Sequence, residues 1–142
     1  MKVTLDKGAF MPTKAHDADA GYDLYLPDRE DAAPVMLPDG KTVVIDTGVH
    51  IALPKGYAAV CMNKSGLSVN HGIESVLGLI DSGYTGPIKV KLRNTSNKPY
   101  IFEAGNKISQ LVIFPISDET LEITNELEDT ERGNRGFGST GA

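Results

Sequence analysis

Glycine and proline divide this chain into short segments. There are 15 glycines and 8 prolines among its 142 residues, a larger share than an average sequence carries. Turn-forming tripeptides, Pro-Asp-Gly at 38–40 and Pro-Lys-Gly at 54–56, separate runs of apolar residues. Short runs at regular spacing with such punctuation predict an all-β protein, built as a sandwich or a barrel.

The apolar runs have the length of β-strands, and most are rich in β-branched or aromatic residues. The predicted strands cover residues 22–26, 42–45, 49–53, 57–62, 88–92 and 107–114. The longest stretch without glycine or proline, residues 116–132, has apolar residues at spacings that fit no full helical stripe, and its second half is acidic. We expect a final strand there that runs into an extended arm.

Size, charge and cysteine content narrow the class of protein. A chain of 15.2 kDa is long enough for one domain and one core. Its net charge of -5 argues against a partner nucleic acid bound through its backbone charge, so any phosphate ligand must be bound locally. The start lacks the apolar stretch of a signal peptide, no run reaches membrane-spanning length, and Cys61 is the one cysteine. We therefore expect a cytoplasmic protein without a membrane partner.

Metal-ligand and nucleophile motifs are missing from the sequence. The three histidines, His16, His50 and His71, have no ligand spacing between them, and Cys61 lies inside a predicted strand. Neither a Gly-x-Ser-x-Gly elbow nor a Walker motif occurs. The remaining carboxylates, hydroxyls, glycines and cations are the groups that magnesium-dependent phosphate chemistry uses.

Three internal segments could carry such chemistry. In residues 78–86, Asp81 follows an apolar run and Tyr84 sits between glycines, so the carboxylate could deprotonate a water while the ring walls off a ligand. An ordinary aspartate-containing turn is the commoner reading of such a segment. Residues 63–68 combine a cation, a hydroxyl and a glycine, which suits phosphate oxygens. Residues 105–111 offer Gln110 within a structural strand.

The last ten residues, Gly-Asn-Arg-Gly-Phe-Gly-Ser-Thr-Gly-Ala, carry too few apolar side chains to form a core. Their composition alone is more typical of a disordered terminus. The alternative is a lid that orders around an anionic ligand, with Phe137 stacking on it. A match to the dinucleotide-binding pattern Gly-x-Gly-x-x-Gly fails because no helix can follow it.

Taken in order, five segments resemble the five motifs of the trimeric deoxyuridine triphosphatase (dUTPase) family. The segments are residues 20–24, 64–67, 78–86, 105–111 and 132–141. The resemblance implies a single domain with a jelly-roll β barrel over about residues 1–125 and a flexible arm over about 126–142. It also implies a homotrimer with active sites shared between subunits, each closed by a neighbour's arm, so the tail becomes a lid.

The implied reaction is hydrolysis of dUTP to dUMP and pyrophosphate, which limits uracil incorporation into DNA and supplies dUMP for dTMP synthesis. Asp81 would activate the attacking water, and Mg²⁺ held mainly by the triphosphate would be supported through waters by Asp23. Backbone groups of the hairpin would read uracil, and Tyr84 would exclude a 2'-hydroxyl. The residues implied to bind substrate are Lys64, Ser65, Gly66, Ser75, Gly78, Leu79, Ile80, Tyr84, Lys89, Gln110, Arg132, Phe137, Gly138, Ser139 and Thr140.

The chain departs from the family pattern at three positions. Lys64 stands where arginine is usual, Ser75 where many members have asparagine, and Arg135 where glycine is usual. Two alternatives remain. A dCTP deaminase shares the fold but needs a glutamate where this chain has Lys91. A nucleotide-binding regulator without turnover would not need Asp81, Tyr84 and the complete glycine-rich arm.

Overall fold

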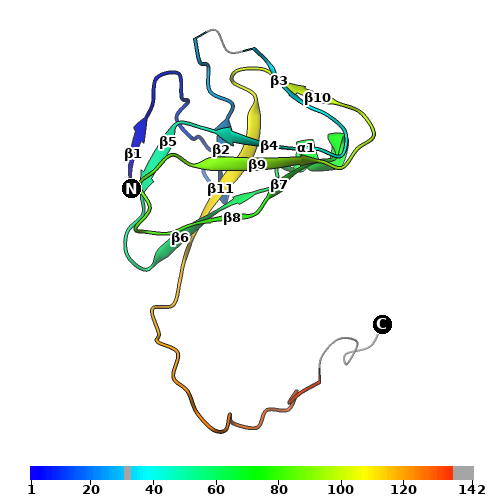
Figure 1. The fold of residues 1–142 in the computed structure, drawn as a ribbon. Helices are drawn as coiled ribbons and strands as arrows, with labels where there is room; N and C mark the ends of the chain where they lie inside the picture. The colour runs from blue at the N-terminus through cyan, green and yellow to red at the C-terminus, as the bar shows by residue number, and fades with distance from the viewer. Residues whose placement is uncertain (31–32, 136–142) are drawn as a thin grey trace.

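The computed structural model describes residues 1–30 and 33–135, and within them the chain forms β-strands and one short helix (Figure 1). The strands before the helix are β1 (Lys2–Leu5), β2 (Gly21–Tyr25), β3 (Val35–Leu37), β4 (Thr42–Asp46), β5 (Val49–Ala52) and β6 (Tyr57–Met62). After the helix α1 (Ser65–His71) come β7 (Ile73–Val76), β8 (Gly78–Ile80), β9 (Lys89–Asn94), β10 (Tyr100–Phe102) and β11 (Lys107–Pro115). The predicted all-β class is confirmed.

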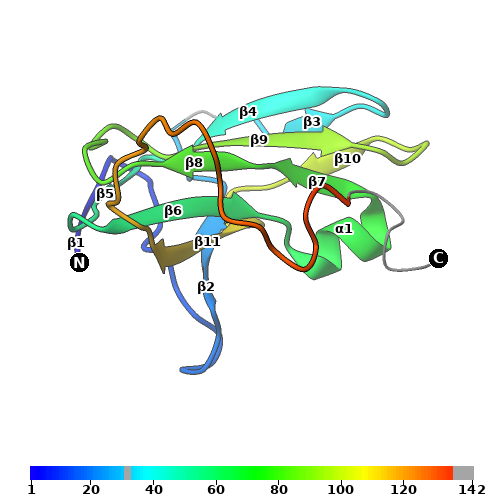
Figure 2. The same cartoon turned by 90° about the horizontal axis from the view of Figure 1, so that it is seen from below.

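The strands pair antiparallel in two larger sheets and two further two-stranded sheets. The order is β2-β11-β6-β8 in one sheet and β4-β9-β7 in the other, while β1 pairs with β5 and β10 with β3. Strand β11 is central, because it pairs with β2 along one edge and with β6 along the other. It therefore holds together segments that are far apart in the sequence (Figure 2).

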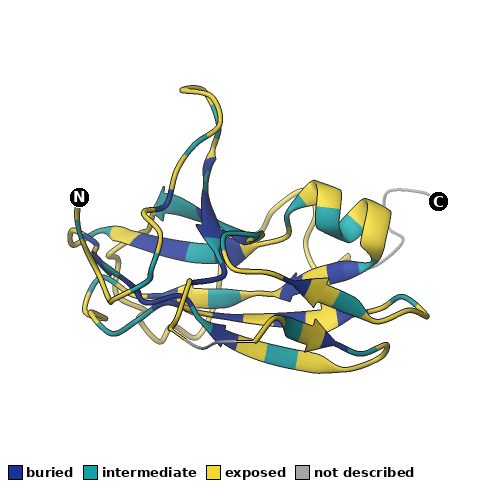
Figure 3. Cartoon of the chain, turned by 90° about the horizontal axis from the view of Figure 1, so that it is seen from above, coloured by how far each residue is buried: buried dark blue, intermediate teal, exposed yellow. Residues whose placement is uncertain are grey.

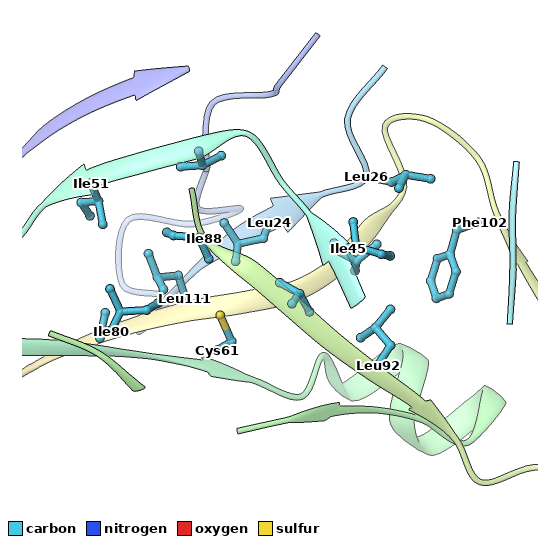
Figure 4. Packing of buried hydrophobic residues seen from close by; sticks show 14 of the residues in the cluster. Leu24, Leu26, Ile45, Ile51, Cys61, Ile80, Ile88, Leu92, Phe102 and Leu111 are labelled. Carbon is cyan, nitrogen blue, oxygen red and sulfur yellow. The ribbon is translucent and has the colours of Figure 1, made fainter. Parts of the chain in front are cut away.

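The core fills the space that these sheets enclose. In β9 the side chains alternate strictly, with Val90 and Leu92 buried and Lys89, Lys91 and Arg93 exposed, as the two-residue period of a strand requires. Figure 4 shows Leu24 of β2, Leu111 of β11 and Ile80 of β8 pointing into the same interior. Burial of such side chains is the main favourable term for folding.

The helix α1 was not predicted. Its seven residues include none that is buried, so no amphipathic pattern marks it (Figure 3). It ends at Gly72, whose φ of 66° lies in the left-handed region and whose N–H bonds to carbonyls of the last turn. The short strands β1, β3, β7, β8 and β10 were also absent from the prediction, because strands of three or four residues give little periodic signal, although the four-residue β5 was predicted within 49–53.

The prediction of a final strand after residue 115 is wrong for the described residues. Strand β11 ends at Pro115, and residues 116–135 form neither strand nor helix. Figure 1 shows this segment leaving the barrel along an extended path. The side chains of Leu121 and Ile123 within it are fully exposed. Separately, none of the described residues belongs to a helix that could traverse a lipid bilayer.

We expect Leu111→Ala to lower the free energy of unfolding by about 2–5 kcal/mol, because it empties a site that is 1% exposed at the centre of the core. Val69→Ala is the matched control, since Val69 on α1 is 80% exposed and should change stability by less than about 0.5 kcal/mol. Denaturant unfolding of both variants measures the difference. Equal stabilities would contradict the assignment of Leu111 to the core.

Candidate active site

The first group of polar side chains, which we name the Asp23 group, consists of Asp23 on β2 with Lys64, Lys107 and Gln110. This carboxylate is 5% exposed and is paired across the sheet with Gln110 of β11. Its two oxygens lie 2.7 Å from the Nζ atoms of Lys64 and Lys107, respectively. Lys64 follows β6 and Lys107 begins β11, so the pairing of β11 with both β2 and β6 brings these three charges together.

The environment of Asp23 decides its charge. Burial by itself would raise the pKa of this carboxyl, but hydrogen bonds and charge attraction from Lys107 and Lys64 outweigh burial and lower the pKa. The same hydrogen bond to Asp23 raises the pKa of Lys107. Asp23 therefore keeps its negative charge near neutral pH, and two lysines against this one carboxylate give the cluster one excess positive charge that can attract an anion.

A chain of hydrogen bonds fixes the backbone next to Lys64. The Gln110 amide donates to the Asn63 carbonyl at 2.7 Å, and the Asn63 side-chain oxygen accepts the Ser75 N–H at 2.7 Å. The hydroxyls of Ser75 and Ser109 lie 3.1 Å apart, and Ser109 donates to the Met62 carbonyl at 2.9 Å. Sequence reasoning missed Asn63, Ser109 and Lys107. Lys107 could have been predicted, because it is a cation within the fourth motif.

The second group lies at the end of β8. A concavity of about 220 Å³ is lined by Cys61, Gly78, Leu79, Ile80, Asp81, Tyr84, Pro87, Ile88 and Lys89. The structure thus gathers Asp81, Tyr84, Lys89 and the β8 residues around one pocket. Cys61 packs in the core beneath it, and burial raises the pKa of its thiol to about 11, so the thiol stays neutral.

Residues 81–88, which we name the Tyr84 loop, connect β8 to β9. The Tyr84 N–H donates to the Asp81 carbonyl at 3.0 Å, and its hydroxyl donates to the Pro87 carbonyl at 2.9 Å. A Cβ at Gly86 would lie 2.5 Å from the Tyr84 hydroxyl oxygen, so only glycine allows the ring this position. The ring therefore lies folded against its own loop.

The two groups are separated within one chain. Strand β8 pairs with β6 so that Gly78 is opposite Cys61 and Ile80 is opposite Ala59. Asp81 therefore leaves the sheet near the start of β6, whereas Lys64 follows its far end, and Figure 2 shows β8 running away from α1. Because a strand rises about 3.3 Å per residue, the two side chains are roughly 15 Å or more apart.

The other predicted residues fall in three places. Ser65 and Gly66 are exposed on the first turn of α1, and Ser75 lies beside the Asp23 group, away from the pocket. Arg132 is exposed in the segment after β11. The predictions for Phe137, Gly138, Ser139 and Thr140 lie outside the described residues. Over residues 1–30 and 33–135, no three His, Cys, Asp or Glu side chains are grouped so that they could hold a metal ion.

Comparison with known proteins was made at the level of sequence and of structure. The dUTPase family model matches residues 7–141. The deoxyuridine 5'-triphosphate nucleotidohydrolase of Cutibacterium acnes is 43% identical over 92% of this chain and 85% of its own. The nucleotidohydrolase of the same name from Dictyoglomus turgidum is 44% identical over 96% of this chain and 94% of its own.

Solved structures are similar over the same length. The dUTPase of Staphylococcus bacteriophage 80alpha with dUpNHpp, a dUTP analogue, has a TM-score of 0.89 and 31% identity, covering 99% of this chain and 98% of that chain. A dUTPase variant from phage phi11 of S. aureus, described for its structural Mg(II) ion, has a TM-score of 0.79 and 28% identity. The match covers 90% of this chain and 98% of that chain. These likenesses confirm the jelly-roll-like fold.

We expect Asp23→Asn to destabilise the protein at pH 7 by about 1–3 kcal/mol, because it leaves two lysines around a neutral amide. A carboxyl whose pKa is lowered by folding contributes stability above its unfolded pKa, and this contribution is lost as pH falls through the folded pKa. The gap between variant and parent should therefore close below about pH 3.8.

Denaturant unfolding at pH 7 and at lower pH measures this gap. The exposed Asp118 provides the control, and Asp118→Asn should leave stability nearly unchanged at both pH values. A constant difference across the pH range would show that the Asp23 charge is not what stabilises the cluster.

Proposed function

The chain belongs to the dUTPase family, and we propose that it hydrolyses dUTP to dUMP and pyrophosphate. One observation carries the proposal at the level of geometry: Asp81 and Tyr84 line the same pocket of about 220 Å³ at the end of β8. The reaction would limit uracil incorporation into DNA and supply dUMP for dTMP synthesis. The buried thiol of Cys61 suits the reducing cytoplasm, where we expect the enzyme to act.

Uracil would be recognised by the backbone of β8. Within the described residues β8 is an edge strand, paired with β6 on one side only, so its other edge has backbone N–H and C=O groups available to a planar base. Gly78 and Leu79 lie at this edge, while Ile80 is buried. A pocket that hydrogen-bonds both edge groups of a base discriminates strongly against bases that lack the matching pattern.

The sugar would lie against Tyr84. Its ring is held by the hydroxyl bond to the Pro87 carbonyl and by contact with Gly86, so it has little room to yield. A 2'-hydroxyl would have to displace the ring or remain buried without a partner, and either costs free energy. Lys89 at the pocket wall supplies a cation for the phosphate chain.

Asp81 would act as the general base. Its carboxylate is exposed at the pocket, where it can hydrogen-bond a water. The water oxygen attacks the α-phosphorus, the bond from that phosphorus to the bridging oxygen of the β-phosphate breaks, and pyrophosphate leaves. Asp81 takes the proton that the water loses, which such bases do with a contribution of about 10²- to 10⁴-fold to the rate.

The donor set suits a Mg²⁺ ion that enters with the substrate. Both oxygens of Asp23 are engaged by lysines, and the described residues hold no group of three ligands, so Asp23 would act only through waters. When bound, the ion neutralises the triphosphate and makes pyrophosphate a better leaving group. Lys64 and Gln110, on the Asp23 group, would bind phosphate oxygens, with Ser65 and Gly66 beside them.

The separation between Asp81 and Lys64 supports a site shared by neighbouring copies. A nucleotide in the β8 pocket of one subunit would place its phosphates on the Asp23 group of the next, in a homotrimer. The barrel, about residues 1–125, would hold both groups. The arm, about residues 126–142, would cross to cover the nucleotide, with Phe137 stacking on uracil, Gly138 contacting the substrate, and Arg132, Ser139 and Thr140 binding the distal phosphates.

The two alternative functions, a dCTP deaminase and a nucleotide-binding regulator without turnover, gain no support. Lys91 is exposed on β9 where a deaminase needs a glutamate, and the relatives described above are dUTP hydrolases. A pyrophosphate-release assay with dUTP and dCTP side by side distinguishes a regulator without turnover from an enzyme.

We expect Asp81→Asn to bind dUTP normally and to lose about 10²- to 10⁴-fold in kcat, because an amide still hydrogen-bonds water but does not accept its proton. Pyrophosphate release measures kcat, and titration calorimetry with a non-hydrolysable dUTP analogue measures binding. Asp39→Asn, in the exposed β3–β4 turn, is the control. Turnover within a few-fold of the parent would remove Asp81 from the role of base.

We expect activity to return when two inactive proteins exchange subunits. Asp81→Asn subunits lack the base, and subunits truncated after Glu131 lack the arm, but mixed trimers contain sites with an intact base and an intact arm. Each protein alone should be inactive with a nearly unchanged thermal midpoint. After mild dissociation and mixing, pyrophosphate release should recover in part. A lack of recovery with exchange confirmed by mass would mean that one chain builds each site.

A further inference from the structure

His50 connects the Tyr84 loop to a different sheet. It lies on β5, opposite Thr4 of β1, and its Nδ1 is 2.8 Å from the Thr85 carbonyl oxygen. Its Nε2 is 3.3 Å from an oxygen of the Asp6 carboxylate, and the Asp6 N–H donates to the Gly48 carbonyl at 2.8 Å. The imidazole, whose side chain is 25% exposed, thus bridges the nucleotide-binding loop and the N-terminal segment.

Both partners of this ring are acceptors. A carbonyl oxygen and a carboxylate oxygen donate nothing, so two hydrogen bonds require both ring nitrogens to carry protons. The surroundings agree with this: the hydrogen bond to the Thr85 carbonyl raises the pKa of His50, burial opposes the rise, and Asp6 and Asp46 add to it. With both nitrogens protonated, the ring is a double donor, and such charge-assisted hydrogen bonds are stronger than neutral ones.

The end of the loop is held by the same part of the fold. The Ile88 N–H donates to the Val49 carbonyl at 2.8 Å, and the Ile88 carbonyl accepts from the Thr47 hydroxyl at 2.8 Å. Residues 47–50 therefore anchor the chain at two points, Thr85 and Ile88. Tyr84, the residue next to the first anchor, bonds to the carbonyl of Pro87, the residue before the second. Its ring position depends on both anchors.

We propose that His50 is a positioning residue that fixes the Tyr84 loop, and with it the ring that excludes a 2'-hydroxyl. The proposal deepens, and rests on, the proposed hydrolysis of dUTP. A recognition group must be held closely in place by the residues behind it, because a loose wall yields to the wrong substrate. His50 supplies that hold from outside the five motifs, and nothing in the sequence pattern singled it out for this role.

The kinetic test compares dUTP with UTP. We expect His50→Leu, which keeps the bulk and removes both donors, to lower the ratio of kcat/KM for dUTP over UTP by about tenfold. His50→Asn keeps a donor near the position of Nδ1 and should restore the ratio to within about threefold of the parent. His16→Leu, at an exposed histidine, is the matched control and should leave the ratio unchanged.

The structural test uses hydrogen exchange on the protein without nucleotide. In His50→Leu the amides of residues 81–88 should exchange faster, above all those of Tyr84 and Ile88, while β11 stays protected. If His50→Leu does not fold, Asp6→Ala tests the same link from the other side of the ring and should loosen the loop in part.

Unchanged exchange in 81–88, or an unchanged dUTP/UTP ratio in a folded variant, would overturn the proposal. Because exchange needs no substrate, a parent protein that does not hydrolyse dUTP would refute the proposed function and leave the anchoring result to be judged separately.

Discussion

The pairing of β11 with two strands at once is the constraint on which the site depends. Asp23 comes from β2, Lys64 from the end of β6, and Lys107 from β11 itself, and they meet only because β11 lies between the other two strands. Any shift of register by one residue would send Gln110 to the opposite face and separate it from Asn63. The core residue Leu111, next in the strand, is what makes such a shift costly.

An acidic protein can bind a polyanion only where its charges are arranged locally. The net charge is -5, yet the Asp23 group carries two lysines against one carboxylate, and Lys89 adds a cation at the pocket. Asp23 keeps both lysine side chains extended toward one point, and its negative charge offsets part of their positive charge. Lys64 stands where the family pattern usually has arginine, so the site has a single point charge there in place of a guanidinium that can form two parallel hydrogen bonds. The orientation of Lys64 by Asp23 is therefore more important.

Much of the fold could be predicted because strands with alternating burial and glycine or proline turns leave a plain signal, as in 88–92, most of which became β9. The helix α1 left none, since none of its residues is buried and the Gly72 cap marks only its end. Among the site residues, Asp81 and Tyr84 stand in a recognisable motif and do share a pocket. His50 and Asn63 act through contacts with residues distant in sequence, and no local pattern encodes such contacts.

The distance between the β8 pocket and the Asp23 group gives a reason for the arm that we propose. The β8 pocket and the Asp23 group are held rigidly in the same sheet, so neither can move toward the other without breaking the pairing of β6. Under the proposed function, another copy would bring the complementary half close enough for one nucleotide to touch both. A segment such as 116–135, which leaves the barrel without strand or helix, has the reach to connect copies, because twenty extended residues span about 60 Å. Rigid halves and a long connection therefore favour catalysis that depends on assembly.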